Sequence, residues 1–377
     1  MATTESTPRG NAPIKSWIAL LGCKDEPADG VEDYCVFLGR ALEKRGVRLE
    51  RVRVPWRERG WLSALRELWR EASAWYGRWV LLQYTALSWS RRGFPIGILA
   101  ALAILKRRGV RCAVVFHEPS GFRGPRWIDR ARGACQGWVV RALHRFSKKS
   151  IFTVPLNTVP KLPRDDERSA FIPLGANIPE NLTNRSSTPD RNGVQKTVAV
   201  FCVSEPPHRE QEISDIYYAA RTAATDGTKL RVIFVGRGTF EAKAEIESAF
   251  KGSSIDVVNR GFCDGDEVSH IFGESDAMLA VRGKLNLRRA SALAGLACGL
   301  PIIGYGGAAR GTVIEEAGVA LVPYGDQQEL GKALQRVLTD PDLWKEMHEK
   351  NRHLQQEYFS WDVVAGSYVE FLAERRY

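Results

Sequence analysis

Residues 282–307 read Arg-Gly-Lys-Leu-Asn-Leu-Arg-Arg-Ala-Ser-Ala-Leu-Ala-Gly-Leu-Ala-Cys-Gly-Leu-Pro-Ile-Ile-Gly-Tyr-Gly-Gly. The segment starts as a cationic loop and runs into a short helix of small and apolar residues; the cationic side chains are Arg282, Lys284, Arg288 and Arg289. We expect Gly299 and Pro301 to end the helix and a buried strand to begin at Ile302. Because a helix start carries unpaired N–H groups and partial positive charge, the segment predicts an anion site.

The length and composition of the chain indicate a globular protein of two domains. Its 377 residues exceed the size of one typical core, and hydrophobic residues at 44% with charged residues at 26% are ordinary values. The seven cysteines are scattered and show no paired spacing, which predicts free thiols in a reducing cytoplasm and no zinc site. The longest apolar run, residues 96–105, is too short to span a bilayer.

Basic charge and tryptophan are concentrated in one part of the chain. Residues 51–150 contain 21 basic and 5 acidic residues and eight of the eleven tryptophans. This composition favours an anionic partner, either a membrane surface or a phosphorylated lipid. Nucleic acid is the competing partner, but we find no nucleic-acid-binding signature and expect none to bind. Segments 56–79 and 89–94 are either a docking face for anionic lipid or core, with Trp61, Trp69 and Trp75 on the buried face of a helix.

Strand and helix patterns alternate along the chain. In the first half, helices expected at 31–45, 97–106 and 132–146 alternate with strands at 16–22, 47–54, 79–83, 112–116 and 151–154. A second series follows the polar segment 181–195, with strands expected at 197–203, 230–235, 256–258, 277–281, 301–304 and 320–322. Repeated βαβ units predict parallel, doubly wound sheets, and therefore an α/β protein with two Rossmann-like domains.

The segment 282–307, with its Ala-Cys-Gly-Leu-Pro run, resembles the donor-binding helix of GT-B glycosyltransferases of the family-4-like group. In that group the loop before the helix holds the diphosphate of a sugar nucleotide. The resemblance implies two Rossmann-like domains facing across a cleft. With a disordered tail at 1–13 and the linker 181–195 set apart, it makes 14–180 an acceptor-binding domain, 196–358 a nucleotide-sugar-binding domain, and 359–377 a C-terminal helix that crosses back to the first domain.

The resemblance also assigns residues to the donor. The implied donor-binding residues are Gly30, Gly236, Phe262, Arg282, Lys284, Asn286, Arg288, Arg289, Ala290 and Ser291. The chain departs from the family at the two glutamates that contact the donor sugar and the ribose, because Asn286 and Ala294 stand in their places. Neither side chain carries a negative charge, and Asn286 alone can accept a hydrogen bond.

The expected phosphate cations are also rearranged. Family members carry an arginine after the first strand of the second domain and a lysine several residues later. Here Ser204 stands at the arginine position, and Arg209 lies near the lysine position and is expected to serve in its place. We expect Arg288 or Arg289 to compensate for Ser204, and we assign a catalytic role to Arg209 and Arg288.

Two turns of the first domain complete the expected site. Residues 28–32 resemble the Gly-Gly-Val-Glu turn that approaches the diphosphate, with Asp29 in place of the first glycine and free N–H groups expected at Val31. His117 and Glu118 follow a strong apolar strand and resemble the His-Glu segment that faces the sugar and the acceptor. His117 is expected to be catalytic, by donating a hydrogen bond or shuttling a proton, and both residues are expected to bind the acceptor.

The resemblance implies a glycosyltransferase that moves a sugar from a nucleoside-diphosphate sugar to an acceptor with retention of configuration. We expect no metal and no other cofactor, because the cationic loop would stabilise the leaving diphosphate. The charge and tryptophans favour a carbohydrate or lipid-linked acceptor in glycan assembly, and thus a cytoplasmic protein, peripheral on the inner face of the cytoplasmic membrane. Two alternatives stay open: a soluble acceptor such as a natural product or peptide, or a catalytically silent GT-B binding subunit.

Overall fold

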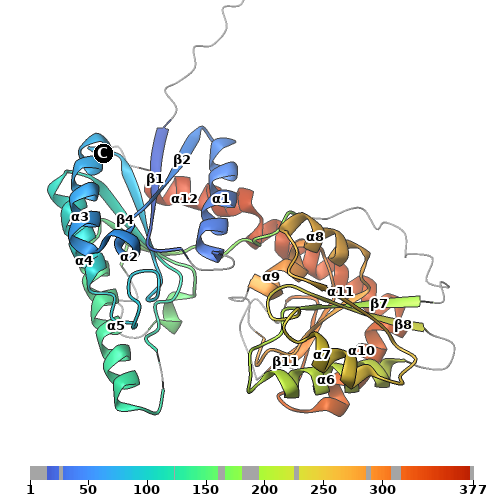
Figure 1. Ribbon diagram of the computed structural model, residues 1–377. Coiled ribbons are helices and arrows are strands. Elements are labelled where there is room, and N and C mark those ends of the chain that lie inside the picture. The colour runs from blue at the N-terminus through green and yellow to red at the C-terminus, as the bar shows by residue number, and fades with distance from the viewer. Residues whose placement is uncertain are drawn as a thin grey trace, which may run out of the picture. The chain divides into compact units, whose positions relative to one another are not determined.

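The structure is a computed structural model that describes residues 15–373 except 25–28, 123, 160–165, 181–194, 225–228, 286–289 and 307–315. The chain forms two compact units. The N-terminal unit comprises the residues up to Pro173 together with those from Val364 onward, and the C-terminal unit comprises Leu174–Val363. Each unit is built on a parallel sheet of six strands flanked by helices (Figure 1).

The N-terminal unit contains strands β1 (Lys15–Leu21), β2 (Val47–Arg53), β3 (Trp79–Tyr84), β4 (Arg111–Phe116), β5 (Lys149–Phe152) and β6 (Ser169–Phe171). Its helical segments are α1 (Gly30–Glu43), α2 (Trp56–Arg59), α3 (Trp61–Glu71), η1 (Ala72–Trp75), α4 (Gly97–Arg107), α5 (Trp127–Phe146) and η2 (Leu156–Thr158). The strand order is β2-β1-β3-β4-β5-β6, so the direction of winding reverses between β1 and β3. Ligands of doubly wound sheets bind beyond the carboxyl ends of the strands at such a reversal.

The C-terminal unit repeats this plan with strands β7 (Gln195–Phe201), β8 (Lys229–Val235), β9 (Asp256–Gly261), β10 (Ala277–Ala280), β11 (Ile302–Gly306) and β12 (Val319–Pro323). Its helical segments are α6 (Arg209–Ala223), α7 (Lys243–Phe250), α8 (Gly265–Glu274), α9 (Ala290–Ala297), α10 (Gln327–Thr339), α11 (Pro341–Leu354) and the π-helical η4 (Gln355–Phe359). The strand order is β12-β11-β10-β7-β8-β9, and the reversal lies between β7 and β10.

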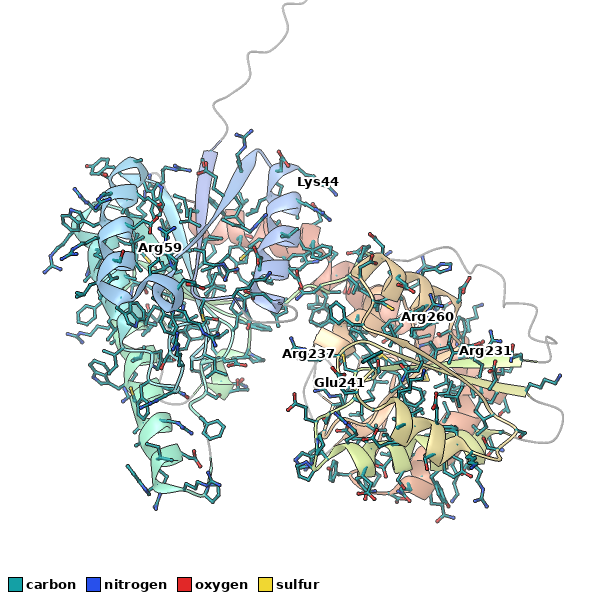
Figure 2. All side chains as sticks on the ribbon, viewed as in Figure 1. Lys44, Arg59, Arg231, Arg237, Glu241 and Arg260 are labelled. Atoms are coloured by element: carbon teal, nitrogen blue, oxygen red, sulfur yellow. The ribbon has the colours of Figure 1, made fainter. Side chains whose placement is uncertain are left out.

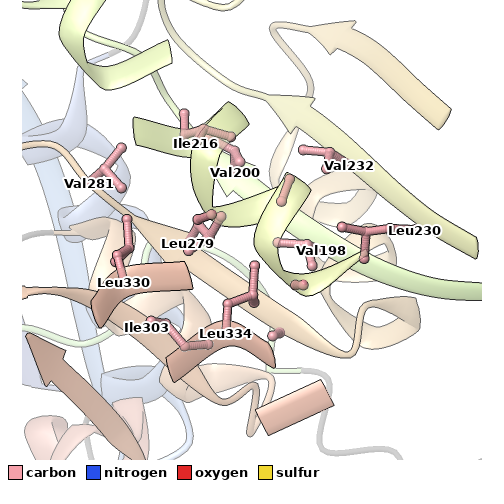
Figure 3. Close-up of a cluster of buried hydrophobic side chains, with 14 of the residues drawn as sticks. Val198, Val200, Ile216, Leu230, Val232, Leu279, Val281, Ile303, Leu330 and Leu334 are labelled. Carbon is pink, nitrogen blue, oxygen red and sulfur yellow. The ribbon is translucent and has the colours of Figure 1, made fainter. Parts of the chain in front are cut away.

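The core of the C-terminal unit lies between its sheet and the helices that cover it. Figure 3 shows apolar side chains of neighbouring strands, such as Val200 and Leu279, packed against Ile216 of α6 and Leu330 of α10. Leu334 recurs one turn after Leu330 because residues four apart share a helix face. The strands read as near-continuous apolar runs because helices cover both faces of a parallel sheet.

The C-terminal helix α12 (Trp361–Leu372) begins in the C-terminal unit and ends in the N-terminal unit, where it contacts α1. At its start, the indole N–H of Trp361 donates to the carbonyl oxygen of Ala176 over 2.6 Å. Further along, the buried hydroxyls of Tyr368 and Tyr34 lie 2.8 Å apart and share a hydrogen bond. The expected return of the chain to the first domain is therefore confirmed.

Most tryptophans of the basic region belong to the core. Trp56, Trp75, Trp79 and Trp89 are all buried. Trp61 is half-buried and stacks on Trp56, with ring centroids 5.1 Å apart. Segments 56–79 and 89–94 were expected to form either a docking face for lipid or part of the core. These tryptophans belong to the core. No helix among the described residues is long and apolar enough to cross a bilayer.

Two tryptophans on α5 differ from these core residues. Trp127 is 73% exposed and Trp138 is 50% exposed. Trp69 of α3 is 39% exposed, and the guanidinium of Arg108 lies 3.8 Å from the centre of its ring. The most exposed indoles of the N-terminal unit therefore lie outside segments 56–79 and 89–94, which were considered as the docking face.

Candidate functional site

A pocket coincides with the reversal of strand order in the C-terminal unit. It is lined from the ends of β7 and β10 and from the start of α9 by Val200, Phe201, Cys202, Met278, Leu279, Ala280, Val281, Arg282, Leu285 and Ser291. The carboxyl ends of β7 and β10 are adjacent because these strands pair in parallel. The pocket therefore occupies the place where doubly wound domains bind ligands.

Arg282 follows β10 and lines this pocket. Its Nε donates a hydrogen bond over 3.3 Å to the Oγ of Ser204, which follows the neighbouring strand β7. The backbone amide of Ser204 in turn donates over 2.8 Å to the carboxylate of Glu212 on α6. The guanidinium of Arg282, which follows β10, is therefore held in place by Ser204, which follows β7.

The wall of the pocket at the end of β7 is conformationally strained. Cys202 has a φ of 65°, a left-handed conformation that residues other than glycine seldom adopt. Its amide is tied to β8 by a 2.8 Å hydrogen bond to the carbonyl oxygen of Val235. Burial raises the pKa of the Cys202 thiol, and the nearby guanidinium of Arg282 opposes this shift. Such strain is found more often at ligand sites than elsewhere.

Two glycines after β8 allow this loop to pack against the end of β7. A Cβ on Gly236 would lie 2.8 Å from the ring of Phe201, and one on Gly238 would collide with the carbonyl oxygen of Val203. Both glycines also have positive φ, 98° and 83°. The expected donor residue Gly236 is thus buried beside the pocket wall. Arg237, between the glycines, is exposed on the same loop (Figure 2).

Arg209, which is predicted to serve as a phosphate cation, makes three polar contacts within the C-terminal unit. Its Nε donates to the carbonyl oxygen of Ser204 over 3.1 Å, and its Nη1 lies 3.3 Å from the carboxylate of Glu245. The same Nη1 donates to the carbonyl oxygen of Glu241 over 3.4 Å. Only 11% of the side chain is exposed. This guanidinium therefore ties the loop after β7 to the region of α7, and its predicted catalytic role stays a prediction.

The start of α9 supplies one further pocket residue. Ser291 lies in the first turn of the helix and lines the pocket, immediately after Ala290. Ala294 is only 1% exposed and is packed in an apolar cluster. The predicted site residues Asn286, Arg288 and Arg289 lie outside the described residues.

Two further predicted donor residues, Lys284 and Phe262, are on the surface of the C-terminal unit. Lys284 is exposed two residues beyond Arg282. Phe262 directly follows β9 and is 57% exposed. The pocket lining includes neither of these two side chains.

His117 follows β4 at the carboxyl edge of the N-terminal sheet. Its Nε2 lies 2.8 Å from Oε1 of Gln83, and the ring of Tyr34 meets it edge-on at 5.0 Å between centroids. Because the amide nitrogen of Gln83 donates to Leu81, His117 donates through Nε2 and keeps Nδ1 as its acceptor. Burial lowers the pKa of His117 to about 4, so the imidazole is neutral in neutral solution. Glu118, the next residue, is exposed.

The expectation of free N–H groups in the turn at Gly30 is wrong, because Asp29 binds them. Its Oδ1 accepts hydrogen bonds from the amides of Val31 and Glu32, each over 3.1 Å, and so caps α1. Arg53 lies 3.2 Å from the carboxylate of Asp29 and 2.8 Å from that of Glu32. The amides expected to be free for a diphosphate are therefore already bonded. Gly30 itself is exposed as the first residue of α1.

Sequence reasoning did not anticipate two partners within these sites. It treated Ser204 as a missing cation, whereas the structure makes it the hydrogen-bond partner of Arg282. It also left out Gln83, which orients His117. For Ser204, a signal was available: in a doubly wound domain the first and fourth strands are neighbours, so residues after them meet.

Comparison with known proteins identifies the fold. No protein-family model matches the sequence, and no curated protein sequence matches it. The structure of HepE from Anabaena in complex with UDP and glucose matches with a TM-score of 0.65 at 12% identity, over 95% of this chain and 99% of that one. A glycosyltransferase from Rickettsia africae matches with a TM-score of 0.65 at 12% identity, over 96% and 99%.

The same architecture also occurs in a protein assigned to a different class of enzyme. A protein from Listeria monocytogenes assigned as a UDP-N-acetylglucosamine 2-epimerase matches with a TM-score of 0.59 at 11% identity, over 95% of each chain. A shared fold at such identities does not fix a reaction, because function depends on the residues of the site. The two Rossmann-like units and these likenesses show that the chain has the GT-B fold, which solved glycosyltransferases share.

Proposed function

We propose that the chain is a glycosyltransferase that binds a nucleoside-diphosphate sugar in the pocket between β7 and β10. The acceptor of the sugar is bound by the N-terminal unit. The observation that carries this proposal is the guanidinium of Arg282, which Ser204 positions at the pocket. The fold supports the class of donor, because HepE, which shares it, was crystallised with UDP and glucose.

The cation absent at Ser204 is supplied from the neighbouring strand. Leu279 of β10 pairs with Val200 of β7, so the residues that follow these strands emerge side by side. Arg282 thereby reaches the carboxyl end of β7, where its Nε meets the hydroxyl of Ser204. The serine aligns the guanidinium, which can bind two phosphate oxygens in a fixed geometry. The start of α9 adds backbone N–H groups to the same anion site.

Transfer of the sugar breaks the bond between its anomeric carbon and a diphosphate oxygen. Negative charge grows on the diphosphate as this bond breaks, and a preorganised cation lowers the barrier by stabilising that charge. Arg282 takes this role, and Arg288 or Arg289 is a candidate for a second cation. The anomeric carbon bonds to the oxygen of an acceptor hydroxyl, whose proton passes to the departing diphosphate, with retention of configuration as the family resemblance implies.

His117 and Glu118 supply the acceptor side of the proposal. At neutral pH the imidazole is uncharged, and its Nδ1 accepts a hydrogen bond from a sugar or acceptor hydroxyl. Glu118 is exposed beside it and offers a carboxylate to further hydroxyls. The excess of basic residues in segment 51–150 supports a carbohydrate or lipid-linked acceptor at an anionic membrane surface.

Thermal melting with UDP, GDP, ADP, TDP and their sugars tests the donor site. A nucleotide at about a hundred times its dissociation constant stabilises the protein by about 2.7 kcal/mol, which is visible as a melting shift. We expect Arg282→Ser to remove the shift. Arg231→Gln removes the same charge near the start of β8, away from the pocket, and should keep it (Figure 2). The absence of a shift with every nucleotide would contradict the proposal.

A second candidate is a catalytically silent subunit that binds a nucleotide or glycan. The observation that favours it is the burial of Ala294 in an apolar cluster, where the family carries a glutamate for the ribose. This candidate predicts no hydrolysis or transfer of the sugar, and a subunit that binds only a glycan or a partner would show no melting shift with any nucleotide. Release of the free nucleoside diphosphate from its sugar, measured by coupled assay on the wild-type protein, would reject it.

A further inference from the structure

The exposed face of α5 carries a continuous stripe of tryptophan and arginine. Its members are Trp127, Arg130, Trp138, Arg141 and Arg145, and we call this set the α5 stripe. All five side chains are exposed, and their spacings are multiples of three and four residues that keep them on one face of the helix. From Trp127 to Arg145 the stripe extends about 27 Å at the normal helical rise.

The α5 stripe carries no exposed negative charge. The single acidic residue of the helix, Asp129, is only 7% exposed and accepts from Arg132, 3.0 Å away. The helix also ends close to cations in the sequence, since Lys148 and Lys149 come after its capping residue, Ser147. The large exposed side chains of this face are therefore cationic or aromatic, with the small Ala134 between Arg130 and Trp138, whereas exposed Arg59 near α3 is paired 2.8 Å from Glu67.

Contacts behind the helix hold the stripe in place. Val139 and Leu143 pack in the core of the N-terminal unit. In the first half of α5, Gln136 accepts from the amide of Phe122 over 2.6 Å and donates to the carbonyl oxygen of Gly93 over 2.9 Å. Arg132 donates to the carbonyl oxygen of Arg92 over 3.0 Å. The stripe therefore belongs to a rigid helix, which runs as a long rod along its unit (Figure 1).

We infer that the α5 stripe docks the protein on a bilayer that contains anionic phospholipids. Arginine side chains attract anionic headgroups, and indole rings are favoured at the boundary between headgroups and acyl chains. A straight helix face that carries both arginine and tryptophan fits a flat surface. Within α5 no exposed acidic side chain lies beside Trp127 or Trp138, so the helix itself does not repel headgroup phosphates from either ring.

This inference names the membrane-binding element for the proposed function, but it stands on residues remote in sequence from the donor pocket. Its test therefore uses vesicles without donor or acceptor, so its failure would leave the nucleotide-melting result unaffected. Conversely, absence of nucleotide binding would leave vesicle binding unaffected. The full chain is used throughout, and the melting temperature of each variant confirms that it is folded.

The test is co-sedimentation with vesicles of phosphatidylcholine alone or with about a third phosphatidylglycerol, at low and at high salt. We expect wild-type protein to sediment with the anionic vesicles at low salt. The triple variant Arg130→Gln/Arg141→Gln/Arg145→Gln should weaken the partition coefficient about a hundredfold, since each basic residue near the surface contributes about fivefold. The matched control Lys44→Gln/Arg48→Gln/Arg51→Gln removes three exposed charges elsewhere in the same unit and should weaken it far less.

The pair Trp127→Ala/Trp138→Ala separates a bilayer from an acidic polymer. Loss of indole insertion should lower vesicle binding at both salt concentrations, while binding to heparin should stay unchanged. Failure of the wild-type protein to bind anionic vesicles at low salt would overturn the inference. Equal loss in the triple variant and its matched control would overturn it too. Heparin binding with vesicle binding that ignores the tryptophans would assign the stripe to an acidic polymer instead.

Discussion

Exchanging two side chains tests whether the phosphate cation has moved from one strand to its neighbour. The variant Ser204→Arg/Arg282→Ser keeps the composition and net charge but returns the guanidinium to the end of β7. Arg282 and Ser204 are joined by a 3.3 Å hydrogen bond, so an arginine at 204 starts from the same region of the pocket. If both positions face one diphosphate, the exchange variant should recover binding that Arg282→Ser alone has lost.

The expected losses follow from the contacts. Arg282→Ser removes charge-assisted hydrogen bonds to phosphate worth about 1.5–3 kcal/mol, which raises the dissociation constant about tenfold to about a hundredfold. Ser204→Ala keeps the guanidinium and removes one aligning bond, so we expect an increase of about twofold to about fivefold. The exchange variant should bind within about tenfold of the wild type, because the cation is restored without its original alignment.

Calorimetric titration with the nucleoside diphosphate and with its parent nucleoside provides the assay. The losses should appear for the diphosphate and vanish for the nucleoside, because only the former presents phosphate oxygens. Wild-type affinity in Arg282→Ser would refute the assignment and move the role to Arg288 or Arg289. An exchange variant that binds no better than Arg282→Ser would refute the claim that positions 204 and 282 face the same phosphates.

Three further predictions concern the framework. Tyr34→Phe and Tyr368→Phe should each lower the free energy of unfolding by about 1 kcal/mol and show a coupling of similar size in a double-mutant cycle; additive losses would mean that their 2.8 Å hydrogen bond contributes nothing. Because burial depresses the pKa of His117 to about 4, protonation favours the unfolded chain, and stability is lost as pH falls below the unfolded value of about 6.5. Between about pH 7.5 and about pH 4.5, wild type should therefore lose about 2 kcal/mol more than His117→Gln in urea titrations, and parallel losses would reject the shift. Gly238→Ala should cost at least about 2 kcal/mol more than Gly252→Ala, because both have positive φ but only Gly238 faces a backbone carbonyl; equal melting temperatures would contradict this.

The two doubly wound sheets were predictable because their strands are buried on both faces. In β3 all six residues are buried, so the strand reads as an apolar run whatever its neighbours are. Polar loops and glycine-capped helices separate such runs, and right-handed connections leave few alternative topologies. The return of α12 to the first domain followed from the family resemblance, and the contact of Tyr368 with Tyr34 confirms it.

The details of the site were less predictable because they depend on side chains that meet across the fold. Ser204 and Arg282 are separated by 78 positions. A motif comparison that treats each position alone therefore counts Ser204 only as the loss of an arginine. Asp29 was read as a missing glycine, whereas its carboxylate bonds the amides that a ligand would otherwise use. Arg209 matched a cation position, but Ser204 and Glu245 hold it in the framework. Residue type alone did not distinguish an arginine that lines the pocket from one that is held by the framework.

The basic, tryptophan-rich composition pointed to an anionic partner but not to the residues that would contact it. Composition counts buried and exposed indoles alike, and a helix expected at 132–146 leaves out Trp127 and Arg130. Helix α5 starts at Trp127 because the carboxylate of Asp129 accepts from the amide of Arg126 over 3.3 Å, which caps the extra turn. Only with that turn in place do Trp127, Arg130 and Trp138 fall on one face. The cap at Arg126 therefore decides whether these residues form one aligned cationic and aromatic face or only contribute to a diffuse positive charge.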